Sequence, residues 1–166
     1  RIIKPLQKMG ADIESMNNKL PIVIRGTKLK SINHVLDIPS AQVKTSIVLA
    51  ALFVKEKTQI IERNITRNHT EIILKSFGAN IEIKKINQMN HIIIKGQNEL
   101  CPKNFIVPCD LSSAAFFIVA ALINDNSNIV MKNINLNPTR TGFLTAIKIM
   151  GGKLIINKRR KVNGEI

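Results

Sequence analysis

The sequence predicts an α/β fold of the α+β type, in which a β-α-β-α-β-β unit is repeated with its apolar helices buried. Three segments share an apolar residue, a glycine and a following strand pattern: Met9-Gly10-Ala11-Asp12-Ile13, Phe77-Gly78-Ala79-Asn80-Ile81 and Met150-Gly151-Gly152-Lys153-Leu154. Two strongly apolar segments, 40–52 and 110–122, both close on Ala-Ala-Leu. Recurrence of this kind is typical of repeated supersecondary units.

The first elements lie before the first apolar segment. Apolar residues at 2, 3, 6 and 9 have helical spacing, and Gly10 ends that helix as a C-cap. Residues 12–15 and 21–24 predict two short strands around a polar turn. A third strand is expected over 32–38 and ends at Pro39.

The segment after Pro39 predicts a helix from Ser40 to Val54. Ser40 is a good N-cap residue, and the segment after Ser46 is apolar almost all round, so the helix is expected to be buried. Its N-terminus offers unpaired N–H groups beside Gln42, which can attract an anion. Lys44 is expected either to add positive potential there or to be exposed to solvent. The simpler interpretation of the whole stretch is an ordinary capped helix.

The rest of the first complete unit follows at once. Residues 58–62 are rich in β-branched side chains and predict a strand. Asn68 is the expected N-cap of a helix to Phe77, with Glu71 in the position of a capping box. Alternation over 80–86 and 91–95 predicts a hairpin, so one whole unit is expected over about 32–97.

The cycle then begins again. The expected elements are strands over 105–107, 128–134 and 153–157, a buried helix over 111–123, an amphipathic helix over 140–150, and a final strand. Asp110 is the N-cap of the buried helix, and we expect Asp110, Ser112, Ser113 and Arg140 to be structural. Both ends of the chain cut through a unit, so we expect an internal fragment of a longer protein.

Composition narrows the class of protein. The chain has 166 residues, of which 45% are hydrophobic, so we expect a packed core. The longest apolar runs, 47–54 and 114–123, are too short to span a bilayer, and we expect a soluble, cytoplasmic protein. Cys101 and Cys109 have no second pair of ligands for zinc, so we expect free thiols and no metal. A disulfide between them is the alternative.

The net charge of +14 indicates anionic partners. A basic nucleic-acid-binding module would fit this charge. The chain has no Trp and no Tyr for base stacking, however, and its helices are apolar rather than basic, which argues against nucleic acid. Small anionic substrates fit the predicted helix N-terminus better.

Four motifs in order resemble one known family. They are Ser40-Ala41-Gln42-Val43-Lys44, Thr66-Arg67-Asn68-His69-Thr70-Glu71, Pro108-Cys109-Asp110-Leu111-Ser112-Ser113-Ala114-Ala115-Phe116 and Asn137-Pro138-Thr139-Arg140-Thr141-Gly142. They resemble the EPSP synthases (3-phosphoshikimate 1-carboxyvinyltransferases) of the enolpyruvyl transferase family. The related UDP-N-acetylglucosamine 1-carboxyvinyltransferases share the fold and are the lesser match, because they are not expected to have Ser-Ala-Gln at this helix start.

The resemblance implies an inside-out α/β barrel of two lobes, with residues 1–107 in one lobe and 108–166 at the start of the other. It implies transfer of the enolpyruvyl group from phosphoenolpyruvate to the 5-hydroxyl of shikimate 3-phosphate, in the shikimate pathway to chorismate and the aromatic amino acids. It implies no cofactor and a monomeric full-length enzyme. The catalytic residues of the family have no counterparts in this chain, so we expect the 166 residues alone to be inactive.

The resemblance also assigns site residues. Ser40, Ala41 and Gln42 match the contacts to shikimate 3-phosphate, and Arg67 matches an arginine that binds the substrate phosphate. His69 is expected to be structural. Two positions depart from the family pattern: Asn68 replaces an aspartate, and Cys109 replaces a glycine. If that glycine has a positive φ, Cys109 would be strained.

Overall fold

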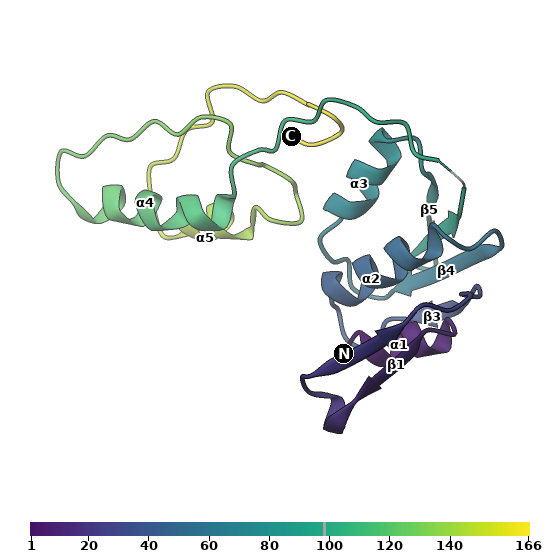
Figure 1. Cartoon of the computed structure of the whole chain (residues 1–166). Coiled ribbons are helices and arrows are strands. Elements are labelled where there is room, and N and C mark those ends of the chain that lie inside the picture. The colour runs from purple at the N-terminus through teal and green to yellow at the C-terminus, as the bar shows by residue number, and fades with distance from the viewer. Residues whose placement is uncertain (98) are drawn as a thin grey trace. The chain divides into compact units, whose positions relative to one another are not determined.

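The computed structural model of the chain describes residues 1–97 and 99–166 and divides into two compact units (Figure 1). The N-terminal unit comprises Arg1–Lys103, and the C-terminal unit comprises Asn104–Ile166. None of the helices in the described residues combines the length and the apolar character of a membrane-spanning segment.

The N-terminal unit contains two sheets. A small antiparallel sheet pairs β1 (Asp12–Ser15) with β2 (Ile22–Arg25), which are joined through a 3-10 turn. The larger sheet has the order β3-β4-β6-β5, and its strands are Asn33–Val35, Lys57–Glu62, Met89–Lys95 and Asn80–Ile86. β3 and β4 are parallel, whereas β4, β6 and β5 are antiparallel neighbours. These strands confirm the predicted elements, although β3 is shorter than expected.

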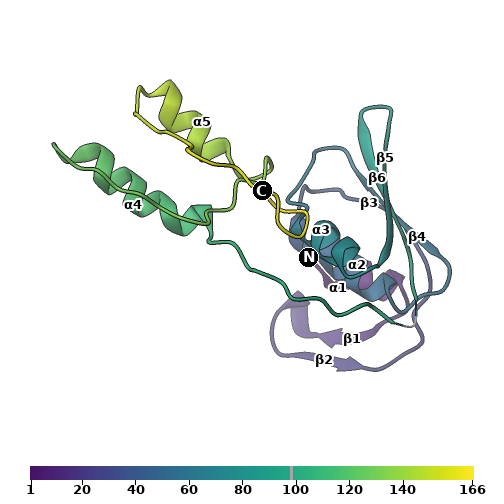
Figure 2. The same cartoon turned by 90° about the horizontal axis from the view of Figure 1, so that it is seen from above.

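Helices α2 (Ala41–Ala51) and α3 (His69–Ser76) lie along one face of the larger sheet, and α1 (Ile3–Lys8) packs against α2 (Figure 2). Successive strand residues face opposite sides, so the buried side of β4 carries Thr58, Ile60 and Glu62. Ile47 and Val48 of α2 are fully buried in the same core. The apolar run of the sequence therefore does form the central helix of this unit.

The three glycine segments share one helix-ending conformation, as the repeat predicts. Gly10, Gly78 and Gly151 have φ values of 90°, 83° and 85°, a conformation that residues with a Cβ rarely adopt. After each glycine the next N–H donates to a carbonyl near the start of the helix's last turn: Ala11 to Leu6 at 3.1 Å, Ala79 to Leu74 at 2.9 Å and Gly152 to Ile147 at 2.9 Å. The same helix C-terminal motif therefore occurs three times, although a strand follows it only after Gly10 and Gly78.

His34 on β3 gives the N-terminal unit a pH-dependent stability. Burial and the positive charge of Lys8 lower its pKa, against an opposing effect of Asp37. Because the folded state favours the neutral imidazole, this stability is complete above the ordinary pKa of 6.5 and is lost as the pH falls below it. We expect the urea midpoint to fall between about pH 7.5 and about pH 5, and to fall less in His34→Gln. Equal falls in the two proteins would contradict this role.

The C-terminal unit contains α4 (Leu111–Ile123) and α5 (Gly142–Ile149) but not the predicted strands. Residues 105–107, 128–134 and 153–157 form no strand in the described structure, so these three predictions are wrong for this chain. Only isolated bridges pair Cys109 with Ile134 and Val162 with Glu165. In the N-terminal unit β4 is held between β3 and β6, and no described segment holds residues 128–134 in that way.

The predicted burial of the helix over 111–123 is also wrong for this chain. Only Leu111 and Ala114 of α4 are buried, whereas Phe116 and Phe117 are 80% and 60% exposed. Its counterpart α2 is covered by the four-stranded sheet, and the C-terminal unit has no described sheet to do the same. The sequence pattern therefore identified a helix that is suited to burial, but the described residues of the C-terminal unit form no sheet that covers it.

Both cysteines are free thiols and exposed, which confirms one of the two alternatives. Cys109 is not among the described residues with positive φ. Its N–H donates to Asn133 and its carbonyl accepts from Asn135, as in a short parallel pairing. The expected strain at this departure from the family pattern is therefore absent.

Candidate functional site

The N-terminus of α2 carries three of the predicted site residues. Ser40 is the N-cap, with extended backbone, and its Oγ accepts from the Val43 N–H at 3.4 Å. The first helical bond runs from the Lys44 N–H to the Ser40 carbonyl. Ala41 is half-buried and Gln42 is exposed. The N–H groups of the first turn have no helical carbonyl four residues earlier to bind. They are therefore directed out of the helix end.

Arg67 lies one residue before the N-cap of α3 and is exposed. Within the described part of the chain, its guanidinium makes no hydrogen bond or ion pair. The first helical bond of α3 runs from Ile72 to the Asn68 carbonyl. The predicted capping by the Asn68 and Glu71 side chains is wrong: the Asn68 side chain makes no capping bond, and Glu71 faces α2 instead.

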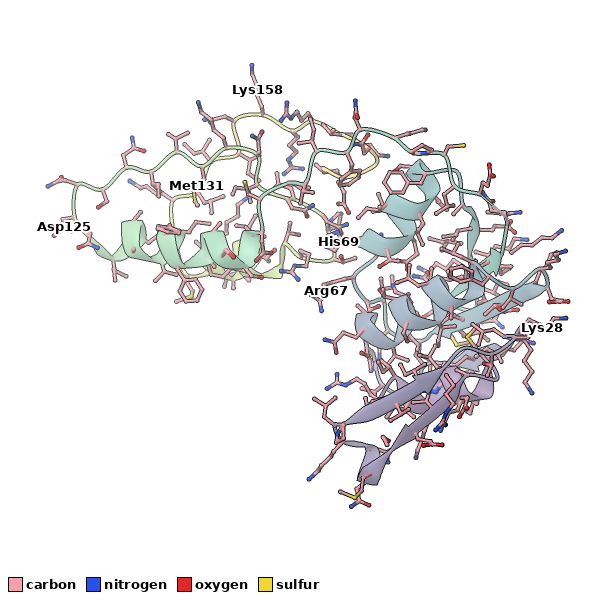
Figure 3. The ribbon with its side chains drawn as sticks, viewed as in Figure 1. Lys28, Arg67, His69, Asp125, Met131 and Lys158 are labelled. Atoms are coloured by element: carbon pink, nitrogen blue, oxygen red, sulfur yellow. The ribbon has the colours of Figure 1, made fainter. Side chains whose placement is uncertain are left out.

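The two helix N-termini lie side by side. Thr45 and Thr70 share a hydrogen bond of 2.7 Å between their Oγ1 atoms, and Lys44 Nζ lies 2.7 Å from Glu71 Oε1. Both contacts join the early turns of α2 and α3. Figure 3 shows Arg67 and His69 where α3 begins, beside the first turn of α2. The predicted site residues on the two segments are thereby brought to one end of the N-terminal unit.

This arrangement is suited to binding an anion. The positive ends of two helix dipoles lie at this same end of the N-terminal unit. Arg67 adds a planar guanidinium that can donate two parallel hydrogen bonds to a phosphate. Gln42 adds a neutral amide that can donate to hydroxyl or carboxylate oxygens. This arrangement suits an anion better than an apolar ligand.

Lys44 does not lie on the surface, so both predictions made for it are wrong. Its side chain is fully buried, with Nζ 3.1 Å from Glu62 Oε1 and 2.7 Å from Glu71 Oε1. Glu62 and Glu71 are themselves 2% and 1% exposed. We call these three residues the buried triad. The two carboxylates outnumber the ammonium, so Lys44 supplies no net positive potential to the helix end.

The buried triad was missed, although the sequence contains a signal for it. Lys44 precedes Ile47, Val48 and Ala51 by three, four and seven residues, which places it on the buried stripe of the helix. Glu62 follows Thr58 and Ile60 in strand alternation and must face the same side. A lysine and a glutamate at buried positions need partners, and here they are partners of each other.

The C-terminal unit holds a second charged cluster at the start of α4. Asp110 Oδ2 accepts from the Ser113 N–H at 3.0 Å, which confirms the predicted cap. Arg140 donates to Asp110 Oδ1 at 2.8 Å and to the Ser112 hydroxyl. The hydrogen bonds from the Ser113 and Ser112 backbone lower the pKa of Asp110, and Arg140 adds to that effect. These contacts give Asp110, Ser112, Ser113 and Arg140 structural roles, as predicted.

Comparison with known proteins gives a consistent result over nearly the whole chain. Residues 1–163 match the family described as EPSP synthase (3-phosphoshikimate 1-carboxyvinyltransferase). A 3-phosphoshikimate 1-carboxyvinyltransferase of Thermoanaerobacter sp. (strain X514) is 46% identical over 99% of this chain and 38% of its own length. The corresponding protein of Gloeothece citriformis is 42% identical over 99% of this chain and 37% of its own length.

A solved structure gives the same match in three dimensions. The EPSP synthase of Acinetobacter baumannii superimposes with a TM-score of 0.82 and 39% identity, over 99% of this chain and 37% of that protein. The chain thus spans 37–38% of the length of these relatives. The likeness extends over both the N-terminal and the C-terminal unit.

Proposed function

The chain belongs to the EPSP synthase family, and on that premise we propose that the protein containing it transfers the enolpyruvyl group of phosphoenolpyruvate to the 5-hydroxyl of shikimate 3-phosphate. The products are 5-enolpyruvylshikimate 3-phosphate and phosphate, formed by addition and then elimination of phosphate. The observation that supports this most is the meeting of two helix N-termini with Arg67 at one end of the N-terminal unit.

These residues are proposed to bind shikimate 3-phosphate. Ser40 and the Ala41 N–H contact the phosphate at the positive end of α2, and Arg67 holds the same phosphate from the α3 side. Gln42 lies on the exposed side of the first turn and contacts the substrate, reaching toward phosphoenolpyruvate. The catalytic groups are not among these residues, and none of them serves as a metal ligand. No cofactor is proposed.

The resemblance places residues 1–107 in one lobe and 108–166 at the start of the other, and we keep this as a proposal. The boundary between the two compact units, after Lys103, lies close to that crossover and supports it. We further propose a cytoplasmic, monomeric enzyme of chorismate and aromatic amino acid biosynthesis that binds no nucleic acid. The two nearest alternatives, a UDP-N-acetylglucosamine 1-carboxyvinyltransferase and a nucleic-acid-binding module, gain no support from the relatives named above.

The proposal predicts that Arg67→Ala in the complete gene product lowers kcat/KM for shikimate 3-phosphate. Loss of a charge-assisted contact of about 1.5–3 kcal/mol corresponds to roughly 10- to 150-fold. Phosphate release from phosphoenolpyruvate and shikimate 3-phosphate measures this, and the isolated 166-residue chain should release none.

The matched control is Arg63→Ala, because Arg63 is an exposed arginine of the same loop. It should leave the rate within about twofold, as most changes at exposed positions do. No transfer to shikimate 3-phosphate by the complete product, or equal rates in wild type and Arg67→Ala, would overturn the proposed function. Transfer to UDP-N-acetylglucosamine instead would support the lesser match.

A further inference from the structure

We propose that Lys44, Glu62 and Thr66 form a positioning unit that fixes Arg67 for the substrate phosphate, an inference that rests on the proposed function. None of the three is proposed to touch the substrate. They act on the backbone from which Arg67 projects, through contacts that lie inside the N-terminal unit.

The carboxylate of Glu62 is the centre of this unit. Its Oε1 accepts from the Thr66 hydroxyl at 2.5 Å and from the Thr66 N–H at 3.3 Å. Lys44 Nζ lies 3.1 Å from the same oxygen. Two hydrogen bonds from Thr66 and the ion pair with Lys44 of α2 therefore converge on one atom at the end of β4.

The loop of residues 63–68 is consequently held at both ends by one lysine. Glu62 precedes the loop and Glu71 follows it, and both pair with Lys44 of α2. The first turn of α2 carries the other half of the proposed site. The buried ammonium, together with the hydrogen bond between Thr45 and Thr70, thus ties the two halves to each other.

Thr66 transmits this constraint to Arg67. It is 9% exposed, and both its hydroxyl and its N–H are bound to Glu62, so the peptide that leads into Arg67 has a fixed start. Arg67 itself is exposed, and its side chain makes no hydrogen bond or ion pair among the described residues. The placement of Arg67 therefore depends on its backbone, and a loop that is already held in place loses little backbone entropy when the ligand arrives.

The burial of the triad indicates that it has a role besides stabilising the fold. Burying three charges costs desolvation, and well-packed apolar residues in place of a buried ion pair are often neutral or stabilising. A cluster of this kind is best suited to specifying geometry. The geometry that it specifies here is the relation of Arg67 to Ser40, Ala41 and Gln42.

The test uses Thr66→Val in the complete gene product, because this change keeps the volume of the side chain and leaves the buried triad intact. We expect the Kd for shikimate 3-phosphate to rise about tenfold, with the KM for phosphoenolpyruvate within about twofold. Thr66→Ser keeps the hydroxyl and should restore the wild-type Kd to within about threefold. A purely structural role would not separate the two substrates in this way.

The chain supplies a matched control in Thr58→Val. Thr58 is fully buried on the same face of β4, and its Oγ1 has no hydrogen-bond partner among the described residues. This change should leave both constants within about twofold. If Thr58→Val and Thr66→Val weaken the binding of shikimate 3-phosphate equally, the proposed positioning role is wrong.

A double-mutant cycle separates this inference from the proposed function. In an Arg67→Ala background Thr66→Val should have no further effect on the Kd, because Thr66 acts only through Arg67. If Arg67→Ala weakens binding and Thr66→Val does not, the proposed function stands and the positioning role fails. If Arg67→Ala itself has no effect, the proposed function fails first.

Discussion

Lys44→Ala is expected to cost about 3–5 kcal/mol of unfolding free energy, the largest effect of any single change considered. The substitution removes the ammonium that lies 3.1 Å from Glu62 and 2.7 Å from Glu71. Two carboxylates that are almost inaccessible to water then face each other without a counter-charge. Chemical unfolding of the chain, followed by circular dichroism, measures the loss.

Whether uncompensated charge causes this loss of stability can be tested by removing all three charges. Lys44→Met with Glu62→Gln and Glu71→Gln removes all three charges and should recover most of the loss, because no uncompensated charge remains buried. Lys84→Ala is the control: Lys84 pairs with Glu82 at 3.1 Å, but both side chains are more than half exposed. Such an exposed pair contributes about 0–1 kcal/mol. A loss of the same size in Lys84→Ala and Lys44→Ala would contradict this account.

Gly96→Ala is expected to destabilise the N-terminal unit by about 3 kcal/mol. The Gly96 N–H donates to the Val54 carbonyl at 2.9 Å, where β6 ends beside the C-terminus of α2. A Cβ at this position would lie 2.5 Å from the Val54 oxygen and 2.8 Å from the Ala51 oxygen, and would also contact the Leu52 carbonyl. All three atoms belong to backbone, so the strand end and the helix end must move apart.

Gly26→Ala provides the comparison for this prediction. A Cβ on Gly26 would meet nothing within 4 Å, and the residue needs no positive φ. The change should therefore be neutral, or stabilising by about 0.4–1 kcal/mol through the unfolded chain. Thermal unfolding of both variants tests this prediction. Equal melting temperatures would mean that the backbone around Gly96 has room for a Cβ.

These two predictions concern opposite ends of the same helix. Lys44 holds the N-terminal end of α2 to β4 and α3, whereas Gly96 allows the C-terminal end to lie against β6. A helix fixed at both ends presents Ser40 and Gln42 in a constant position. The stability of the N-terminal unit and the geometry of the proposed site therefore depend on the same contacts.

Much of the N-terminal unit could be predicted because its signals are local. Strand alternation, the Ser40 cap and the glycines at 10 and 78 each specify a conformation within a few residues. The site residues could be proposed because they stand in motifs. That the two N-termini meet was implied only by the resemblance and not by the residues themselves, because the contact of Thr45 with Thr70 depends on the packing of segments far apart in sequence.

The wrong predictions have a common physical origin. A strand needs a neighbour and an apolar helix needs a cover, and the sequence pattern reports only the suitability of a segment for these roles. Residues 128–134 and α4 have the pattern without the described partners. The prediction for Lys44 was wrong for the opposite reason. A charged side chain was expected at the surface, although its position on the apolar stripe of the helix indicated burial.

The central claim is that Arg67 and the helix N-termini recognise the phosphate of shikimate 3-phosphate. Calorimetric titration of the complete gene product with shikimate 3-phosphate and with shikimate gives the ratio of their dissociation constants, which isolates the phosphate. Arg67→Ala should reduce this preference by roughly 10- to 150-fold, whereas Arg63→Ala should leave it unchanged within about twofold. An unchanged preference in Arg67→Ala, or none in the wild type, would contradict the account.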